Sequence, residues 1–154
     1  MTLDELAAAW RAAWADPAGG FESCCTPDVT YEDPVAIQPL DGLDALEGHA
    51  ARLRVAFPDL RVEPSAVPVG DGAMACIPWR AIGTNKGDLA GLPATRRFVV
   101  MQGVHYVELL DGRVRRARGF FDLYDTAVQL GLLPQRGSFG EKALLVLRGF
   151  GLRA

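Results

Sequence analysis

Asp122, His105 and Arg118 lie in two runs of β-forming residues that flank the pair Asp111-Gly112. An Asp-Gly pair between such runs predicts a β-hairpin with a two-residue turn, because both turn residues tolerate positive φ. In that hairpin His105 lies opposite Arg118, and Met101 lies opposite Asp122. Side chains alternate between the two faces of a strand. One face therefore mixes charged, imidazole and aromatic groups, which suits a pocket wall better than a plain core: Met101, Gly103, His105, Arg118, Phe120 and Asp122.

Asp122 is the candidate general acid–base. Met101, Phe120 and Trp79 would flank it on the same face, and an apolar environment raises the pKa of a carboxyl group. Such a carboxylate can take a proton from a carbon next to a carbonyl and return it elsewhere. The structural alternative is that Asp122 caps the helix expected to begin near Asp125, or pairs with an arginine.

His105 and Arg118 lie two residue pairs further along the hairpin, roughly 13 Å from Asp122. That distance is too long for a catalytic dyad, so we expect them to bind a polar substrate group at the far end of an elongated pocket. The alternative is that both are solvated at the rim of the sheet. On another strand, Tyr31 and Asp33 share a face, and a buried Tyr31 hydroxyl could donate to a developing enolate. Asp33 could equally form a turn before the proline that follows it.

Aromatic residues spread along the chain are candidates for the apolar walls of the same pocket. Most aromatic residues at regular spacing belong to the core, and that is the alternative here. A lining with few polar groups would suit a polyketide, terpenoid or steroid-like substrate. The candidates are Trp10, Trp14, Phe57, Trp79 and Phe120.

Composition and charge exclude several classes of protein. With 154 residues, of which 49% are hydrophobic, the chain is expected to form one domain over residues 1–154. A net charge of -3 gives no reason to expect nucleic-acid binding. Four arginines between 113 and 118 are expected to split between two faces of their strand. The acidic, amphipathic start is unlike a secretory signal, and no apolar run reaches the length of a membrane span. The three cysteines have no metal-ligand or disulfide spacing, which predicts a reduced, cytoplasmic protein without a metal site.

Hydrophobic periodicity predicts the elements that must position these residues. Helices are expected over 3–15, 21–25, 43–57 and 125–132, and strands over 29–33, 60–69, 73–84 and the two arms of the hairpin. His49 falls beside the apolar stripe of its helix, where a lone histidine is usually structural or solvent-facing. A dense apolar helix over 138–150 must pack against its own sheet or a partner subunit. The order predicts an α+β fold, a curved, mostly antiparallel sheet wrapped around the N-terminal helices, with a cone-shaped cavity.

Short segments from Tyr31 to Gly131 match a known family in the expected order. The order of elements resembles the NTF2-like, or cystatin-like cone, superfamily, and more narrowly its SnoaL-like branch, which includes polyketide ester cyclases. The segments are Tyr31-Glu32-Asp33-Pro34, Ala56-Phe57-Pro58-Asp59-Leu60, Gly83-Thr84, Gly91-Leu92-Pro93-Ala94-Thr95, Gly103-Val104, Asp111-Gly112-Arg113-Val114, Phe121-Asp122 and Gln129-Leu130-Gly131.

The resemblance implies a general acid–base role for Asp122, intramolecular aldol chemistry, and no metal or organic cofactor. Two positions depart from the family pattern. Asn85 follows Gly83-Thr84 where many relatives have a histidine; it could bind a substrate carbonyl but cannot shuttle protons. Thr95-Arg96 stands where relatives often have Thr-Gly.

The sequence therefore predicts a cofactor-independent enzyme of the polyketide cyclase type, which acts on a hydrophobic small molecule through Asp122. The alternatives are an epoxide hydrolase, isomerase or dehydratase on the same scaffold, and a non-catalytic binding or assembly domain. The epoxide hydrolase would need an arginine held between two carboxylates. We also expect a homodimer, because the other face of the hairpin is too apolar to be left in water. That face is expected to carry Val100, Val104, Tyr106, Phe121 and Leu123.

Overall fold

A single curved sheet runs through the part of the chain that the computed structural model describes, residues 1–89 and 91–150. Its strand order is β2-β1-β7-β6-β5-β3, with β4 paired to β5. Only the β1–β7 pair is parallel. The strands are β1 (Cys25–Glu32), β2 (Leu40–Asp41), β3 (Arg61–Pro64), β4 (Val69–Gly70), β5 (Met74–Thr84), β6 (Phe98–Leu110) and β7 (Arg113–Phe121).

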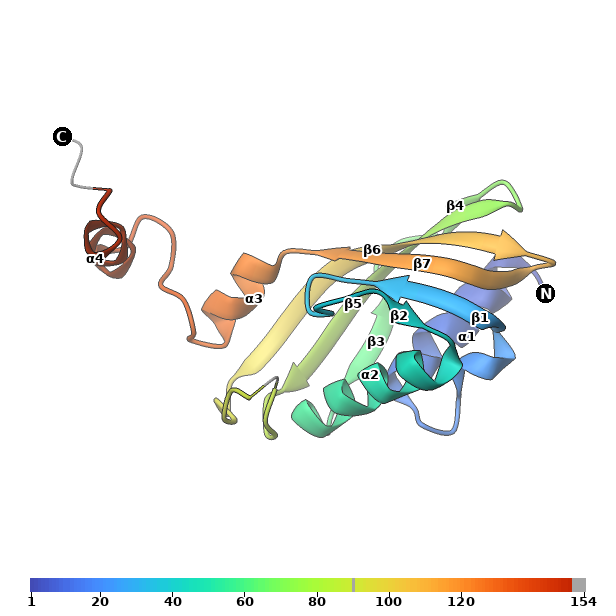
Figure 1. Ribbon diagram of the computed structural model, residues 1–154, viewed down its shortest axis with the longest axis horizontal. Coiled ribbons are helices and arrows are strands. Elements are labelled where there is room, and N and C mark those ends of the chain that lie inside the picture. Colours follow the sequence, from blue (N-terminus) through green and yellow to red (C-terminus); the bar gives the residue numbers. More distant parts are fainter. Residues whose placement is uncertain (90, 151–154) are drawn as a thin grey trace.

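Two helices, α1 (Leu3–Ala15) and α2 (Leu43–Ala56), lie against one face of this sheet, and the opposite face is left uncovered (Figure 1). A capping box fixes the start of α1, since the Thr2 side chain accepts from the Glu5 N–H and the Glu5 carboxylate accepts from the Thr2 N–H. The buried stripe of α1 holds Leu6, Ala7, Trp10, Ala13 and Trp14. The predicted α+β class, with the sheet wrapped around the N-terminal helices, is confirmed.

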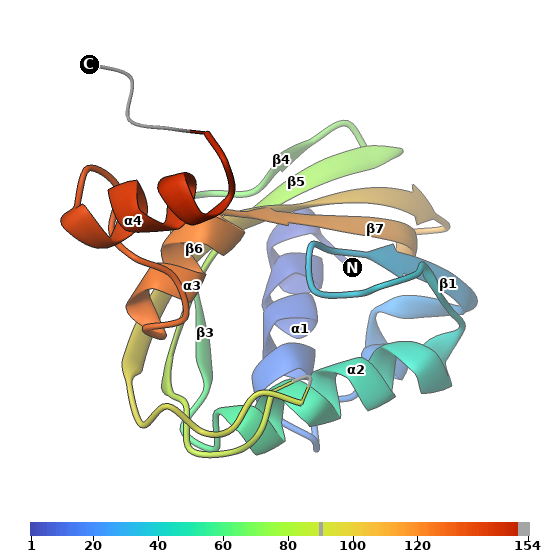
Figure 2. The ribbon, with the colours of Figure 1, turned by 60° about the vertical axis from the view of Figure 1, so that its left-hand side comes forward.

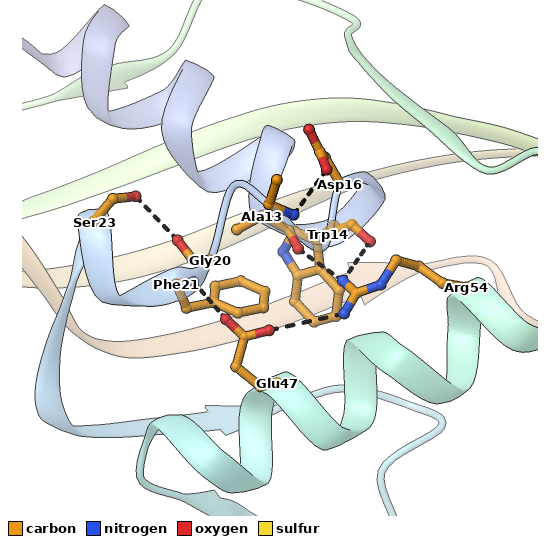
Figure 3. Close-up of polar contacts among 9 residues, drawn as sticks. Ala13, Trp14, Asp16, Gly20, Phe21, Ser23, Glu47 and Arg54 are labelled. Atoms are coloured by element: carbon orange, nitrogen blue, oxygen red, sulfur yellow. Dashed lines mark hydrogen bonds and ion pairs between the residues drawn. The ribbon is translucent and has the colours of Figure 1, made fainter.

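Two side chains of α2 fix the end of α1 and the short 3-10 helix Phe21–Ser23 that follows it (Figure 3). The Arg54 guanidinium donates to the carbonyl oxygens of Ala13 and Trp14, at 3.0 and 3.4 Å. These carbonyls have no partner within their own helix, so a cation there is favourable. Glu47 accepts from the Phe21 N–H at 2.7 Å and lies 3.8 Å from Arg54. The position of Trp14 is thereby set by α2.

The Asp-Gly turn forms as predicted, with φ of 51° at Asp111 and 74° at Gly112. The predicted pairing beyond it is wrong, because a β-bulge intervenes. Leu109 pairs with Val114, but Glu108 pairs with Arg116, which leaves Arg115 as the extra residue on β7. Every later pair is shifted by one residue, so that His105 lies opposite Gly119 and Val104 opposite Phe120.

The bulge reverses which side chains of β7 face the helices. Arg118 and Phe120 lie on the uncovered outer face, whereas Phe121 points inward. All four arginines of this strand are exposed: Arg113, Arg115, Arg116 and Arg118. The outer face therefore holds Val100, Val104, Tyr106 and Phe120. Phe121 and Leu123, which were expected on that face, line the inner cavity instead.

Other element boundaries also differ from the predictions. The expected strand over 60–69 is two strands, because the prolines at 64 and 68 interrupt it. Helix α3 spans Leu123–Gln129 and so begins before Asp125. None of the described helices has both the length and the hydropathy of a membrane span.

Helix α4 (Phe139–Leu147) stands apart from the sheet, beyond α3 (Figures 1 and 2). None of its residues is buried, and Phe139 and Leu147 are 86% and 83% exposed. Packing of this helix against its own sheet, one of the two expectations, is therefore wrong.

Candidate active site

A cavity of about 270 Å³ lies between the covered face of the sheet and helices α1, α2 and α3. Its size is near the lower end of the range for small-molecule sites, about 300–1,000 Å³. The walls are almost wholly apolar, and most predicted aromatic candidates line it: Trp14, Phe57 and Trp79, together with Met101. The polar residues of the lining are Tyr31, Asp33, His105 and Thr126.

Asp122 lies outside this lining and is exposed. Its carboxylate caps α3 by accepting a hydrogen bond from the Asp125 N–H at 2.8 Å. The structural alternative for this residue is therefore the one observed. The expectation that it shares a face with Met101 failed because the bulge shifts the register.

Arg118 and Phe120 also lie away from the cavity. The Arg118 guanidinium sits over the Phe120 ring, 5.3 Å from its centre, and lies 4.0 Å from Glu32. The predicted role for these two residues in the same pocket as His105 is wrong, since they face the outer side of the sheet.

Asn85 is buried but holds a loop rather than a ligand. Its amide nitrogen donates to the carbonyl oxygens of Ala56 and Gly87, at 3.3 and 2.8 Å. Its amide oxygen accepts from the N–H and the hydroxyl of Thr95, at 2.7 and 3.0 Å. Because both amide hydrogens are used, no donor is left for a substrate carbonyl.

Tyr31 and His105 meet in the lining of the cavity and form, with Trp10, a chain of buried polar contacts. The Trp10 indole N–H donates to Nδ1 of His105 at 3.0 Å, and Nε2 of His105 lies 3.2 Å from the Tyr31 hydroxyl. Burial, with smaller effects from the Asp33 carboxylate, raises the pKa of Tyr31 well above its usual value. Tyr31 is thus a neutral hydroxyl at physiological pH.

The His105 imidazole is stacked between two indoles. Its ring centre lies 5.5 Å from that of Trp14, at an interplanar angle of 3°, and 5.3 Å from that of Trp79, at 27°. Burial lowers the pKa of His105 to about 3, although the nearby Asp33 carboxylate opposes the shift. His105 is therefore neutral across the physiological range.

Asp33 directly follows β1 and is the only carboxylate in the cavity lining among the described residues. One oxygen accepts from the N–H groups of Val35 and Ala36, both at 2.7 Å, and the other lies 2.9 Å from Nε2 of His49. Burial alone would raise the pKa of Asp33, but the His49 contact and the two N–H groups together lower it. Asp33 is an ionised carboxylate at neutral pH.

Sequence reasoning missed one residue of this cluster as a functional candidate and misplaced another. His49 was expected to be structural or solvent-facing, and it is buried against Asp33. Trp10 was a candidate for the apolar wall of the pocket, but it lies outside the cavity lining. Gly119 completes the cluster, because a Cβ there would lie 2.8 Å from the Tyr31 hydroxyl and 3.2 Å from the Cβ of Asp33. Glycine at 119 therefore allows Tyr31, Asp33 and His105 to converge.

No group of three or more His, Cys, Asp or Glu side chains within residues 1–89 and 91–150 could hold a metal ion. The arrangement instead offers an ionised carboxylate and a neutral hydroxyl at the end of an apolar cavity. Such a pair can accept a proton from carbon and stabilise the charge that develops on an adjacent oxygen.

Comparison with known proteins adds a family and a set of similar folds. The family model described as SnoaL-like polyketide cyclase matches residues 3–130. TsrD from Streptomyces laurentii is similar in structure, with 22% identity, a TM-score of 0.74, and coverage of 85% of this chain and 96% of that one. A provisionally assigned SnoaL-like polyketide cyclase from Jannaschia sp. CCS1 has 22% identity, a TM-score of 0.73, and coverage of 85% and 92%. IdmH from Streptomyces antibioticus, provisionally assigned as a polyketide cyclase, has 21% identity, a TM-score of 0.69, and coverage of 83% and 97%. Among curated proteins, none matches the chain.

Proposed function

Because the chain belongs to the SnoaL-like polyketide cyclase family and has the NTF2-like, ketosteroid isomerase-like fold, we propose that it is a cofactor-independent acid–base enzyme. Its substrate is a hydrophobic, polyketide-like carbonyl compound, which it closes into a ring by an intramolecular aldol-type reaction. The observation that carries the proposal is the pairing of an ionised Asp33 with a neutral Tyr31 at the end of one apolar cavity.

In this mechanism Asp33 takes a proton from the carbon next to a substrate carbonyl. Tyr31 donates a hydrogen bond to that carbonyl oxygen and stabilises the enolate. The enolate carbon then attacks a second carbonyl carbon of the same molecule, and a C–C bond forms. The new alkoxide takes the proton back from Asp33, so the residues return to their starting state without a further reactant.

The environment of Asp33 limits the range of compounds that can serve as substrates. Its lowered pKa makes it a weak base, so the C–H bond that it breaks must be unusually acidic. A carbon between two carbonyl groups meets this requirement, and such carbons are characteristic of polyketide chains. The cavity of about 270 Å³ suits a bicyclic product.

The proposal assigns the base to Asp33 rather than to Asp122, and a matched pair of variants separates the two. The probe is 2-tetralone, an apolar bicyclic ketone whose hydrogens between the carbonyl group and the aromatic ring are unusually acidic, and the exchange of these hydrogens for deuterium in D2O is followed by NMR. Asp33→Asn should lower the protein-catalysed exchange rate by about 100-fold, the scale of general-base catalysis. Asp122→Asn should retain it within about threefold, because asparagine caps a helix as well as aspartate does.

The opposite pattern would assign the base to Asp122, as the resemblance implies, and would overturn the proposal. Binding of 2-tetralone without catalysed exchange by the unaltered protein would favour the non-catalytic binding domain. The epoxide hydrolase alternative gains no support, because the described lining holds one carboxylate and no arginine.

A further inference from the structure

We propose that Trp10, a residue outside the cavity, determines the direction of hydrogen bonding at the site. It holds His105 in the tautomer with hydrogen on Nε2 and so makes the Tyr31 hydroxyl a donor toward Asp33 or a bound carbonyl. This inference rests on the proposed function, and it assigns Trp10 as a positioning residue for it.

The first step concerns which nitrogen of His105 carries the hydrogen. An indole N–H can only donate, so Nδ1 of His105, 3.0 Å from Nε1 of Trp10, must present its lone pair. A neutral imidazole carries one hydrogen, which therefore lies on Nε2. The other tautomer would place two N–H groups against each other in a buried site, and each would lose its partner.

The second step concerns Tyr31. The Nε2–H of His105 donates to the Tyr31 oxygen, 3.2 Å away. A hydroxyl that accepts a hydrogen bond keeps its own hydrogen free to donate. Asp33 is the carboxylate that faces Tyr31 across Gly119. If His105 carried its hydrogen on Nδ1 instead, Nε2 would accept from Tyr31, and the hydroxyl hydrogen would be turned away from the substrate.

The third step is that Trp10 acts without touching the substrate. Its side chain is fully buried and is not part of the cavity lining. The rings of Trp14, Phe21 and Tyr31 surround it, with ring centres 5.8, 5.2 and 6.2 Å away. The orientation of its N–H is therefore fixed by the packing of α1 on the sheet.

The tautomer can be measured directly in the unaltered protein, without substrate. Long-range ¹H–¹⁵N NMR distinguishes protonated from unprotonated imidazole nitrogens, and the chain has only two histidines to assign. His49→Gln removes one set of signals and identifies the other. We expect Nδ1 of His105 to be unprotonated and Nε2 to be protonated at pH 7. A protonated Nδ1, in either the neutral or the charged ring, would overturn the inference.

Trp10→Phe removes the N–H and keeps an aromatic ring. It should convert His105 to a mixture of tautomers and lower the 2-tetralone exchange rate at least about tenfold, with the affinity for 2-tetralone changed less than twofold. The matched control is Trp14→Phe, on the same helix. Trp14 stacks on His105 without hydrogen bonding to it, so this variant should keep the Nε2–H tautomer.

The outcomes separate this inference from the proposed function. An unchanged tautomer in Trp10→Phe, or an unchanged exchange rate despite a changed tautomer, would refute the role of Trp10 and leave the function of Asp33 standing. Retained exchange in Asp33→Asn would refute the function, while the tautomer measurement would still decide the hydrogen-bond pattern. If Trp10→Phe does not fold, the measurement on the unaltered protein decides.

Discussion

Acidification from pH 7 to pH 5 should lower the free energy of unfolding by about 2 kcal/mol through His105 alone. The pKa of His105 is about 3 in the folded protein and 6.5 in an ordinary environment. Between these values the unfolded chain binds a proton that the folded chain does not. The contribution of neutral His105 to the free energy of unfolding is therefore fully present above pH 6.5. It is lost as the pH falls towards 3, by about 1.4 kcal/mol per pH unit.

Two ionisable groups beside His105, Tyr31 and Asp33, do not change their protonation between pH 7 and pH 5. Tyr31 is neutral throughout it, since its pKa is raised. The pKa of Asp33 is lowered, so the stability that Asp33 contributes is present above the ordinary carboxyl value and is lost only at lower pH.

The assay is urea unfolding followed by circular dichroism at pH 7, 6 and 5. The control is His105→Gln, whose free energy of unfolding should fall by about 2 kcal/mol less than that of the unaltered protein over the same range, because the variant lacks only the contribution of His105. If that variant does not fold, an NMR titration of His105 in the unaltered protein replaces it. An equal loss in the two proteins, or a His105 that titrates near 6.5, would refute the reasoning.

Three further predictions test other parts of the fold. Arg96 has a φ of 63°, a conformation that is strained for a residue with a Cβ. Arg96→Gly should therefore raise the free energy of unfolding, measured in urea, by about 0.5–1 kcal/mol, whereas Arg96→Ala should not. Equal effects of the two variants would contradict backbone strain. Gly119→Ala should lower the free energy of unfolding by about 1–3 kcal/mol and suppress 2-tetralone exchange, because its Cβ would collide with the Tyr31 hydroxyl. The control is Gly48→Ala on α2, where a Cβ would make one ordinary contact, 3.8 Å from the Arg52 guanidinium, and this variant should raise the free energy of unfolding by about 0.5–1 kcal/mol. We also predict a homodimer through the uncovered sheet face, and Val104→Arg should make it monomeric in analytical ultracentrifugation; a monomeric unaltered protein at micromolar concentration would contradict this.

Local signals in the sequence predicted the elements well. The capping box at Thr2, the Asp-Gly turn and the proline-bounded strands each depend on a few neighbouring residues, and each formed as expected or nearly so. The bulge was missed because no glycine or proline next to Arg115 indicates one. The structure shows two adjacent exposed residues there, Arg115 and Arg116, which break the alternation of buried and exposed side chains along the strand.

The site was only partly predictable, because its residues are far apart in the sequence and meet only in the folded protein. Tyr31, Asp33 and His105 were each identified, but their meeting depends on the register between β6 and β7. His49 reaches Asp33 from a helix that the loop after β1 brings back across the strand, and no local pattern encodes that contact. Asn85 was assigned to a ligand because the family pattern drew attention to its position, whereas its hydrogen bonds serve the loop.

The aromatic surroundings of His105 have an optical consequence. All three tryptophans of the chain lie within 5.5 Å of this imidazole, measured between ring centres. Indole emission responds to polarity and to neighbouring rings, and all the tryptophan emission of the protein originates around His105. Two of the three emitters, Trp14 and Trp79, belong to the wall of the cavity. Filling the cavity should therefore change most of the emitted light, and libraries of unlabelled compounds can be screened by the colour and intensity of that emission.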